Sequence, residues 1–509
     1  MSVKSVLAKP FANVIQRRVM KWSSEAERAQ EFWFHKLLIE GKKTAFGKEH
    51  YFEGIMSYDE YVKQVPLHEY EEFIPYIDRI KNGEENVLWK GKPIYFAKSS
   101  GTTAGVKYIP ISKESISNHI DTARNALLMY IAETGNTQFV KGKMMFLSGS
   151  PELERVGEIL TGRLSGIVNH HVPRYLRGNQ MPNYETNCIE DWEMKVDRIV
   201  EETMNEDMTL ISGIPPWMQM YFDKLIEKSG KQTIKEVFPN FQLLVYGGVN
   251  FEPYRAKLFK TTGEKIDSIE TYPASEGFIA FQDSQNAEGL LLNVDSGIFF
   301  EFVPASEFFS SSPTRLQMRD VDTDANYAVV ISSNAGLWSY VLGDTVKFVS
   351  RNPYRIVVTG RTKHYISAFG EHVIAEEVEY ALMKAASEAR LEVIEFTVAP
   401  QVNPASGELP YHEWFVEVTG PPADVNSLRL RVDELLCEKN IYYNDLITGH
   451  ILQPLKITLL QKDGFRNYMK SIGKLGGQNK VPRLSNDRQI ADALQPWVLN
   501  ESGYSSIRQ

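Results

Sequence analysis

The chain has 509 residues, of which 43% are hydrophobic and 24% are charged, and its formal net charge at pH 7 is −9. A chain of this length and composition is expected to be globular and to bury one large hydrophobic core and a smaller second one, in two domains. The acidic balance, without any block of lysine and arginine residues, excludes the basic surface typical of nucleic-acid binding, so no nucleic-acid partner is expected.

The first residues of the chain predict a helix at the surface. They mix apolar and basic residues at helical spacing, but neither they nor any later stretch form an uninterrupted apolar run long enough for export or for a membrane span. The only two cysteines, Cys188 and Cys437, lie far apart and predict neither a disulfide framework nor a zinc cluster. These features favour a protein of the reducing cytoplasm.

Short β-prone runs alternate with amphipathic stretches along the middle of the chain, which is typical of mixed α/β folds. Helical segments extend to about residue 81, and the first β-prone run, residues 93–96, leads into AKSSGTTAGVKYIPIS at residues 97–112. Five consecutive residues there are hydroxyl-bearing or glycine: Ser99, Ser100, Gly101, Thr102 and Thr103. Their hydroxyls and backbone N–H groups can surround the oxygens of a polyphosphate, so the segment predicts a phosphate-binding loop.

This loop differs from the common nucleotide-binding loop. It is not a P-loop of the kind Gly-x4-Gly-Lys-Ser/Thr, because Gly101 and Gly105 are too close together and Tyr108 follows Lys107. Lys107 would add a positive charge near a bound phosphate. A surface turn rich in serine, glycine and threonine is the plain structural alternative.

Further β-prone runs end in turns that are rich in glycine, proline or polar residues. The runs are residues 142–149, 208–213, 241–246 and 266–271. After the second run, Pro215 and Pro216 suit the first turn of a helix over residues 217–227. Gly247 and Gly248 follow the third run, and YPASEG at residues 272–277 follows the fourth. Because ligands of open α/β sheets bind beyond the carboxyl ends of strands, these turns are candidate site positions.

The second half of the chain predicts the end of the large domain and the whole of a small one. Residues 289–349 stay rich in β-prone residues, except for a polar segment at residues 310–326 that is expected to be a solvent-exposed loop. A strand over residues 355–359 leads to a linker at residues 360–363. A helix at residues 375–390, a hairpin at 394–418, a helix at 424–439, a strand at 457–460 and a helix at 464–471 follow. The expected domains are residues 1–360 and residues 361–509.

Several residues in these turns suit nucleotide recognition. Tyr272 offers an aromatic plane for adenine or for an acyl group, and Glu276 is a hard oxygen ligand suited to Mg²⁺ between phosphates. Asp344, in the segment YVLGD, could accept hydrogen bonds from both ribose hydroxyls, and Arg361 could donate to the ribose or to phosphate. The structural alternatives are an exposed carboxylate for Glu276, a Gly-Asp turn for Asp344 and a surface guanidinium for Arg361.

Together, SSGTTAG at residues 99–105, YPASEG at 272–277, YVLGD at 340–344 and TGR at 359–361 resemble the motifs of the adenylate-forming superfamily. That superfamily includes acyl-CoA synthetases, peptide-synthetase adenylation domains and firefly luciferase. Within it the chain is most similar to the auxin-responsive Gretchen Hagen family of acyl acid amido synthetases. The resemblance implies a large amino-terminal domain of β-sheets flanked by helices, a small mobile α/β carboxyl-terminal domain, and a hinge after Gly360-Arg361.

The resemblance also assigns ATP-binding roles, position by position. The phosphates would be contacted by Ser99, Ser100, Gly101, Thr102 and Thr103. The adenine and the activated carboxyl group would lie against Gly247, Gly248, Tyr272, Pro273 and Ser275. Glu276 would bind Mg²⁺ and act in catalysis, and the ribose would be held by Asp344 and Arg361.

Two further sets of residues are assigned in the same way. A lysine of the small domain would neutralise charge at the α-phosphate; Lys480, in the segment QNKVPR, matches it best, and Lys474 is the competitor. The acyl substrate would lie against Arg124, Trp217 and Val249. From the residue itself, a solvated arginine on a helix is the structural alternative for Arg124.

The reaction implied by the resemblance uses ATP and Mg²⁺. A carboxylic acid attacks the α-phosphorus of ATP to give an acyl-adenylate and pyrophosphate, and an amine, expected from an amino acid, then gives an amide and AMP. The nearest alternative is an acyl-CoA ligase that passes the acyl group to CoA. A more distant one is a nucleotide- or acyl-binding protein without catalysis, which would not require the combination of Glu276, Asp344, Arg361 and Lys480.

Overall fold

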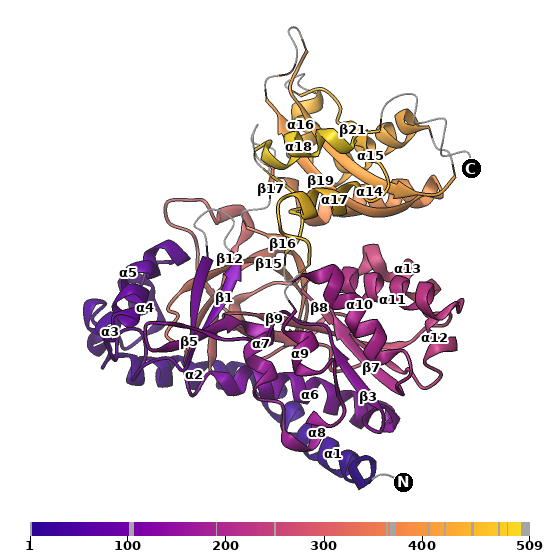
Figure 1. The fold of residues 1–509 in the computed structure, drawn as a ribbon. Coiled ribbons are helices and arrows are strands. Elements are labelled where there is room, and N and C mark those ends of the chain that lie inside the picture. Colours follow the sequence, from indigo (N-terminus) through magenta and orange to yellow (C-terminus); the bar gives the residue numbers. More distant parts are fainter. Residues whose placement is uncertain are drawn as a thin grey trace. The chain divides into compact units, whose positions relative to one another are not determined.

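The computed structural model describes residues 3–100, 106–189, 191–248, 251–362, 365–366, 373–402, 404, 408–421, 424–448, 452–476, 479–485 and 487–499. Its contacts divide the chain into two compact units. The first comprises Met1–Leu342 and Val346–Val358, and the second comprises Gly343–Thr345 and Thr359–Gln509. Figure 1 labels the elements of each unit.

Helices form the amino-terminal part of the first unit. They are α1 (Val3–Ser24), α2 (Ala26–Gly41), α3 (Ala45–Glu49), η1 (Phe52–Gly54), α4 (Tyr58–Gln64) and α5 (Tyr70–Lys81). Their starts follow from the local sequence. The Ser57 hydroxyl accepts a hydrogen bond from the N–H of Glu60 at the start of α4, and the Glu72 carboxylate accepts one from the N–H of Glu69 at the start of α5.

The serine-rich segment lies at the end of a β-hairpin in a four-stranded sheet. The sheet has the order β2 (Val106–Ile111), β1 (Tyr95–Ser100), β5 (Ile159–Arg163) and β4 (Glu154–Val156). β1 reaches further than the β-prone run that predicted it, so that Ser99 lies opposite Lys107 and Ser100 lies opposite Val106. The two serines therefore belong to the strand, and residues 101–105 lie outside the described part of the chain.

A 12-stranded mixed sheet forms the centre of the first unit. Its order is β13 (Leu316–Gln317), β12 (Ile298–Pro304), β14 (Asn326–Ser333), β15 (Tyr340–Arg351), β16 (Tyr354–Arg361), β11 (Leu290–Leu292), β10 (Gly277–Phe281), β9 (Asp267–Ala274), β8 (Leu243–Gly247), β7 (Met208–Gly213), β3 (Lys143–Phe146) and β6 (Gln180–Met181). Strands β6, β3, β7, β8 and β9 run parallel to one another, whereas β9 and β10 form an antiparallel hairpin.

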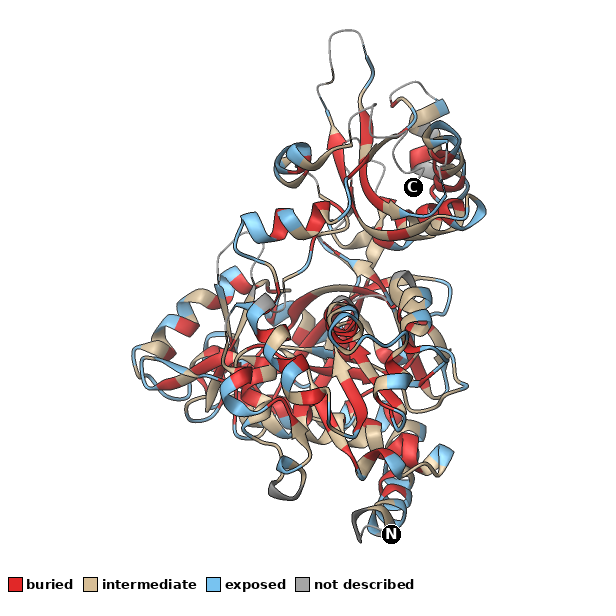
Figure 2. Ribbon diagram, turned by 45° about the vertical axis from the view of Figure 1, so that its right-hand side comes forward, coloured by how far each residue is buried: buried red, intermediate tan, exposed pale blue. Residues whose placement is uncertain are grey.

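Helices cover both faces of the parallel part, so alternate residues of one strand enter different cores. The helices of this part are α6 (Ile116–Thr134), α7 (Leu164–Asn169), α8 (Arg174–Arg177), α9 (Tyr184–Asn187), α10 (Trp192–Thr203), α11 (Pro215–Ser229), α12 (Ile234–Val237) and α13 (Glu252–Thr262), with η2 (Gln138–Val140) before β3. Met144 packs in a cluster with Met129 of α6, and the next residue, Met145, packs in a cluster with Trp217 of α11. Figure 2 shows that much of the central sheet of the first unit consists of buried residues.

Close packing at the carboxyl end of β8 requires a glycine. A Cβ atom added to Gly247 would lie 2.2 Å from the carbonyl oxygen of Thr271 on the neighbouring β9. No side chain tolerates such a distance, because the contact is with backbone of a paired strand. The short separation of β8 and β9 at this point therefore depends on Gly247.

Gly247→Ala is expected to lower the free energy of unfolding by roughly 1–3 kcal/mol, the usual cost of forcing an extra carbon into a packed interior. Urea unfolding of the purified variant measures this change. Gly178→Ala is the matched control, because a Cβ atom there would meet nothing within 4 Å and Gly178, which follows α8, has a right-handed backbone conformation. Equal stability of the Gly247→Ala variant and the wild type would contradict the prediction.

The polar segment at residues 310–326 is not wholly a solvent-exposed loop. β13 pairs antiparallel with β12, and the side chain of Arg315 is only 4% exposed. The expectation was wrong for this part of the segment because the Arg315 charge is paired in the interior with Glu301, which is 0% exposed. Residues 310–312 are exposed, as expected.

The second unit is a smaller α/β arrangement. Its strands are β17 (Tyr365–Ile366), β18 (Val373–Ile374), β19 (Glu392–Gln401), β20 (Tyr411–Thr419) and β21 (Lys456–Leu459), and its helices are α14 (Ala375–Glu388), α15 (Val425–Lys439), α16 (Ile441–Thr448), α17 (Gly464–Ser471) and α18 (Gln489–Leu494), with η5 (Gln495–Trp497). The sheet β19-β20-β21 packs with α14 and α15 around one core that includes Trp414 and Leu436. The two units together confirm the expected mixed α/β fold.

None of the helices in the described part of the chain combines the length and the apolar character that a membrane crossing requires.

Candidate functional site

Glu276 lies at the tip of a tight hairpin. Gly277 at the start of β10 pairs with Ala274 at the end of β9, so only Ser275 and Glu276 connect the two strands. Both residues are partly buried, and Pro273 beside them is exposed. The hairpin thus holds the Glu276 carboxylate at the carboxyl end of β9, where the sequence predicted a site.

The Tyr340 hydroxyl orients this carboxylate. It donates a hydrogen bond to Oε1 of Glu276 at 3.3 Å. Burial, followed by the negative charge of Glu276, raises the pKa of Tyr340 well above its usual value. Tyr340 therefore keeps its proton and remains a hydrogen-bond donor to Glu276 at all physiological pH values.

Asn118 of α6 holds the other side of the same hairpin. Its side-chain oxygen accepts a hydrogen bond from the N–H of Phe278 at 2.6 Å, and its side-chain amide donates to Oγ of Ser296 at 2.8 Å. Because α6 begins five residues after β2 ends, this contact ties the serine-rich hairpin to the Glu276 hairpin. Three segments that are distant in sequence, at residues 118, 276 and 340, are therefore joined by side-chain contacts.

Two glycines, the last residue of β8 and the residue after it, lie next to the strand that carries Tyr272. Gly247 is paired with Thr271, the residue that precedes Tyr272 on β9. Gly248 is exposed and has a φ of 81°, which glycine adopts without strain. Tyr272 is 7% exposed and packs within the largest hydrophobic cluster, so most of its ring is committed to the core.

Asp344 and Arg361 form an ion pair within the second unit. Nε of Arg361 lies 2.8 Å from Oδ1 of Asp344, and the side chains are 51% and 16% exposed. Gly343 has a φ of 85°, and its carbonyl oxygen accepts a hydrogen bond from the N–H of Thr362 at 2.9 Å. This bond joins the two segments YVLGD and TGR next to the ion pair.

Lys480 belongs to the same group of charges. Loss of hydration around its ammonium group lowers the pKa of Lys480 to about 8; the positive charge of Arg361 adds to the lowering, and Asp344 opposes it. Lys480 as a whole residue is exposed, so the loss of hydration concerns the ammonium end of its side chain. Lys474, the competing candidate, is also exposed, and its backbone N–H donates to the carbonyl oxygen of Met469 after α17.

Of the residues expected to form the acyl pocket, Arg124 takes part in an ion pair on its own helix, and Trp217 is buried. Arg124 lies 2.9 Å from Asp121 of the same helix and over the ring of Phe11 of α1. Trp217 is 5% exposed and packs against the ring of Trp192 at a centroid distance of 4.6 Å. These contacts give both residues a structural role, and their roles in acyl binding stay predictions.

Some predicted site residues cannot be placed. Gly101, Thr102, Thr103 and Val249 lie outside the described residues, as does Lys363 in the expected linker, and of Ser100 only the backbone is described.

Two residues of the site were missed by sequence reasoning. Tyr340 begins the recognised segment YVLGD, so its position was a signal that went unused. Asn118 carries no such signal, because a single asparagine in a helix has many ordinary explanations.

The carboxylate at the hairpin tip fits a magnesium ion that is bound together with a nucleotide. Among the described residues, no group of three or more histidine, cysteine, aspartate or glutamate side chains could hold a metal alone. Mg²⁺ usually needs only one or two protein carboxylates when substrate phosphates supply further oxygen ligands. Glu276, fixed by Tyr340 on one oxygen, meets this requirement.

Comparison with known protein families gives three matches that follow one another along the chain. Residues 15–185 match the GH3 family N-terminal domain, residues 291–361 match the GH3 family central domain, and residues 376–489 match the GH3 family C-terminal domain.

Similar proteins of known activity share low sequence identity with the chain over most of its length. A jasmonoyl–L-amino acid synthetase of Nicotiana attenuata, JAR4, is 22% identical over 79% of this chain and 81% of its own. The indole-3-acetic acid-amido synthetase GH3.3 of Arabidopsis thaliana is 22% identical over 98% of this chain and 95% of its own. Among solved structures, the GH3.15 acyl acid amido synthetase superposes with a TM-score of 0.79 at 15% identity and covers 97% of both chains. That structural likeness establishes the fold.

Proposed function

Because the chain belongs to the GH3 family, we propose that it is an ATP-dependent ligase that adenylates a carboxylic acid and transfers the acyl group to an amine, expected to be that of an amino acid. The names of its relatives, which join jasmonate or indole-3-acetate to amino acids, support this reaction class. The observation that carries the proposal is the Glu276 hairpin, with its carboxylate oriented by Tyr340 at a strand end.

In the first step a carboxylate oxygen of the acid attacks the α-phosphorus of ATP, pyrophosphate leaves, and an acyl-adenylate forms. The protein contributes position and charge to this step. The Asp344 carboxylate accepts hydrogen bonds from the ribose hydroxyls, with Arg361 beside it. The Lys480 ammonium offsets the negative charge that builds up as the carboxylate of the acid approaches the α-phosphate of ATP.

Glu276 would hold Mg²⁺, which supplies charge neutralisation between the phosphates when it is bound. The hydroxyls of the serine-rich segment and its backbone N–H groups would bind the outer phosphates. Gly247, Gly248 and Tyr272 would lie against the adenine and the activated carboxyl group.

In the second step the amine attacks the carbonyl carbon of the acyl-adenylate, the amide bond forms, AMP leaves and the amine releases a proton. Both cysteines are unsuited to act as nucleophiles near neutral pH, because burial raises the pKa of Cys437 to about 12 and raises that of Cys188 above its usual value. A cysteine-bound acyl intermediate is therefore not part of the proposed reaction, in which the acyl group moves from AMP to the amine.

The proposal is tested by a pyrophosphate-release screen in which carboxylic acids are crossed with amino acids and with CoA. Release that depends on an acid, together with an amide product identified by mass spectrometry, is the expected result. A thioester product in place of the amide would identify an acyl-CoA ligase. No release with any acid in a broad panel would contradict the proposal.

Asp344→Asn is expected to raise the KM for ATP about tenfold to a hundredfold, because a neutral amide replaces a charged acceptor of two ribose hydrogen bonds. ATP–pyrophosphate exchange at saturating acid measures this KM. Glu388→Gln is the matched control, since it breaks an exposed ion pair of the same unit in which Nε of Arg431 lies 2.8 Å from Glu388. An unchanged KM for ATP with a reduced kcat would argue against a ribose contact.

Location in the cytoplasm belongs to the same proposal. Both cysteines are free thiols, which is the ordinary state of cysteine in a reducing compartment. The partners would be small molecules: the acid, ATP and the amine acceptor.

A further inference from the structure

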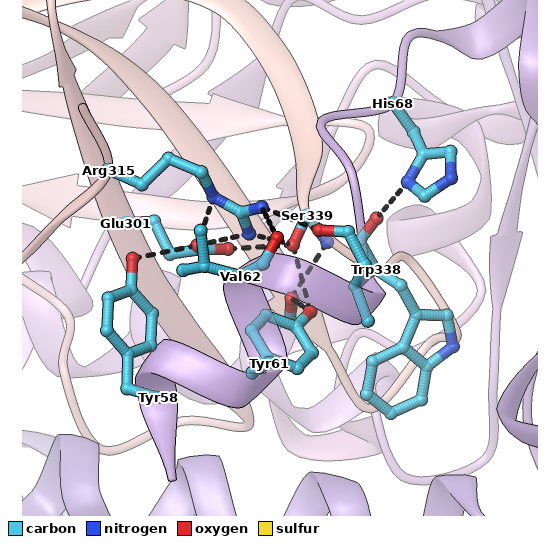
Figure 3. A network of polar contacts seen from close by, with 10 residues as sticks. Tyr58, Tyr61, Val62, His68, Glu301, Arg315, Trp338 and Ser339 are labelled. Atoms are coloured by element: carbon cyan, nitrogen blue, oxygen red, sulfur yellow. Dashed lines mark hydrogen bonds and ion pairs between the residues drawn. The ribbon is translucent and has the colours of Figure 1, made fainter. Parts of the chain in front are cut away.

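A buried ion pair lies next to the start of β15, the strand that carries Tyr340. Oε1 of Glu301 on β12 is 2.9 Å from Nε of Arg315, and the two side chains are 0% and 4% exposed. The Tyr58 hydroxyl also donates to Oε1 of Glu301 at 3.0 Å, and Nη1 of Arg315 donates to the carbonyl oxygen of Val65 at 2.5 Å. Figure 3 shows that Tyr58, Glu301 and Arg315 face one another from separate segments of the chain.

The Ser339 hydroxyl is hydrogen-bonded to both members of the ion pair. Nη2 of Arg315 donates to Oγ of Ser339 at 2.6 Å, and this Oγ lies 2.9 Å from Oε2 of Glu301. Since a hydroxyl has one proton, the natural assignment is that Ser339 accepts from the guanidinium and donates to the carboxylate. The Ser339 N–H donates to Oγ of Ser332 at 2.9 Å, so every polar group of Ser339 on this side is bonded.

The backbone of Ser339 has a conformation that serine rarely adopts. Its φ is 42°, in the left-handed region, and such a conformation persists only where the surroundings determine it. His68 supplies the remaining restraint: its N–H donates to the carbonyl oxygen of Ser339 at 2.9 Å, and its carbonyl oxygen accepts from the N–H of Val341 at 2.8 Å. The network therefore fixes the residues on either side of Tyr340.

Stability alone gives little reason for this pair. Removing two charges from water costs more than their attraction returns in many buried pairs, and apolar replacements of similar size often leave a protein as stable as before. This pair is bonded to the side chain of Ser339, whose backbone is in a strained conformation, so a role in fixing geometry is the better explanation. The residue directly after Ser339 is Tyr340, whose hydroxyl is bonded to Glu276.

We propose that Glu301, Arg315 and Ser339 are positioning residues that hold the Tyr340 hydroxyl on the Glu276 carboxylate. The role rests on the proposed function, because Glu276 is the carboxylate assigned to Mg²⁺ there. None of the three side chains touches the nucleotide in this assignment. They act by fixing the backbone turn from which Tyr340 projects.

The test is a mutational cycle between the pair and Tyr340. E301Q/R315M removes both charges and the guanidinium hydrogen bonds at similar side-chain volume, and Y340F removes the hydroxyl through which the network is proposed to act. Each is expected to lower kcat of acid-dependent ATP–pyrophosphate exchange about tenfold, and the combination of all three substitutions is expected to be no slower than either alone. If the combined variant instead showed the two tenfold losses multiplied, a fall in kcat of about a hundredfold, the proposal would be overturned.

A second buried pair of the same unit supplies the control. Arg355 and Asp283 lie 2.6 Å and 2.9 Å apart through two parallel hydrogen bonds, with side chains 11% and 12% exposed, and Asp283 follows the end of β10 that is remote from Glu276. D283N/R355M is expected to keep the wild-type kcat. An equal loss in this control, or a loss in E301Q/R315M that only matches a lower thermal midpoint, would show a structural role alone. S339A is a milder variant, which should show the same overlap with Y340F.

A crystal structure of the E301Q/R315M variant gives a readout that needs no activity. The expected result is a Ser339 backbone outside the left-handed region and a Tyr340 hydroxyl that no longer contacts Glu276. An unchanged Tyr340–Glu276 contact would overturn the positioning role even if the protein proved not to be a ligase. Failure of the wild type to exchange pyrophosphate with any acid would count against the proposed function only.

Discussion

Glu276→Gln is expected to lower kcat of acid-dependent ATP–pyrophosphate exchange about 10²-fold to 10³-fold, the usual cost of losing one charge-stabilising group in an active site. Glutamine has the shape of glutamate and can still accept the hydrogen bond of Tyr340, so the change removes little except the negative charge that would hold Mg²⁺. Initial rates at saturating ATP and acid, measured over a range of Mg²⁺ concentrations, check the prediction.

Two comparisons make the result specific. Glu288→Gln changes an exposed carboxylate between β10 and β11 and should leave kcat unchanged. The thermal midpoint of the Glu276→Gln variant should equal that of the wild type, because the hairpin keeps its backbone pairing. A variant that exchanges pyrophosphate at the wild-type rate would remove Glu276 from the proposed reaction.

Lys480→Ala is expected to lower kcat of adenylation about 10²-fold to 10³-fold while ATP affinity changes little, because a charge used mainly in the transition state contributes to rate and not to ground-state binding. Exchange kinetics and calorimetric titration with ATP measure the two quantities separately. Lys474→Ala, which changes another exposed lysine six positions earlier, is the matched control. Equal losses of rate and affinity would favour a protein that only binds nucleotide, and a loss confined to Lys474→Ala would reverse the assignment of the two lysines.

The lowered pKa of Lys480 adds a dependence on pH. With a pKa of about 8 the ammonium loses its proton as the pH rises through that value, so adenylation by the enzyme should decline above about pH 8. Lys480→Arg retains its charge over this range, and any activity it keeps should not show the decline. A profile of kcat/KM against pH for both proteins decides the matter.

Elements with a local pattern could be predicted from the sequence. The runs at residues 208–213 and 464–471 became β7 (Met208–Gly213) and α17 (Gly464–Ser471), because alternation or helical spacing is visible within one element. The short strands β4 and β5 were missed, since each depends on its neighbours in the sheet. For the same reason the extension of β1 to Ser100 needs the partner strand β2.

In the candidate site, too, local segments could be recognised from the sequence, whereas contacts between distant residues could not. Segments such as YPASEG and YVLGD are recognisable in the sequence, but the bond between residues 276 and 340 is a long-range contact that no local period encodes. Arg315 was misplaced because a charged residue among serines and prolines resembles an exposed loop, and its buried partner Glu301 stands 14 positions earlier on another strand. Sequence reasoning thus found the chemical groups and missed what holds them.

The short connection between β9 and β10 limits how enzymes of this design can be altered. The two-residue turn fixes the register of the two strands, so one added residue at Ser275-Glu276 would have to be taken up by a longer turn of different shape, which would move the Glu276 carboxylate. Protein engineers who wish to change substrate choice should therefore exchange residues in this hairpin without changing its length, and reserve insertions for exposed segments such as residues 310–312.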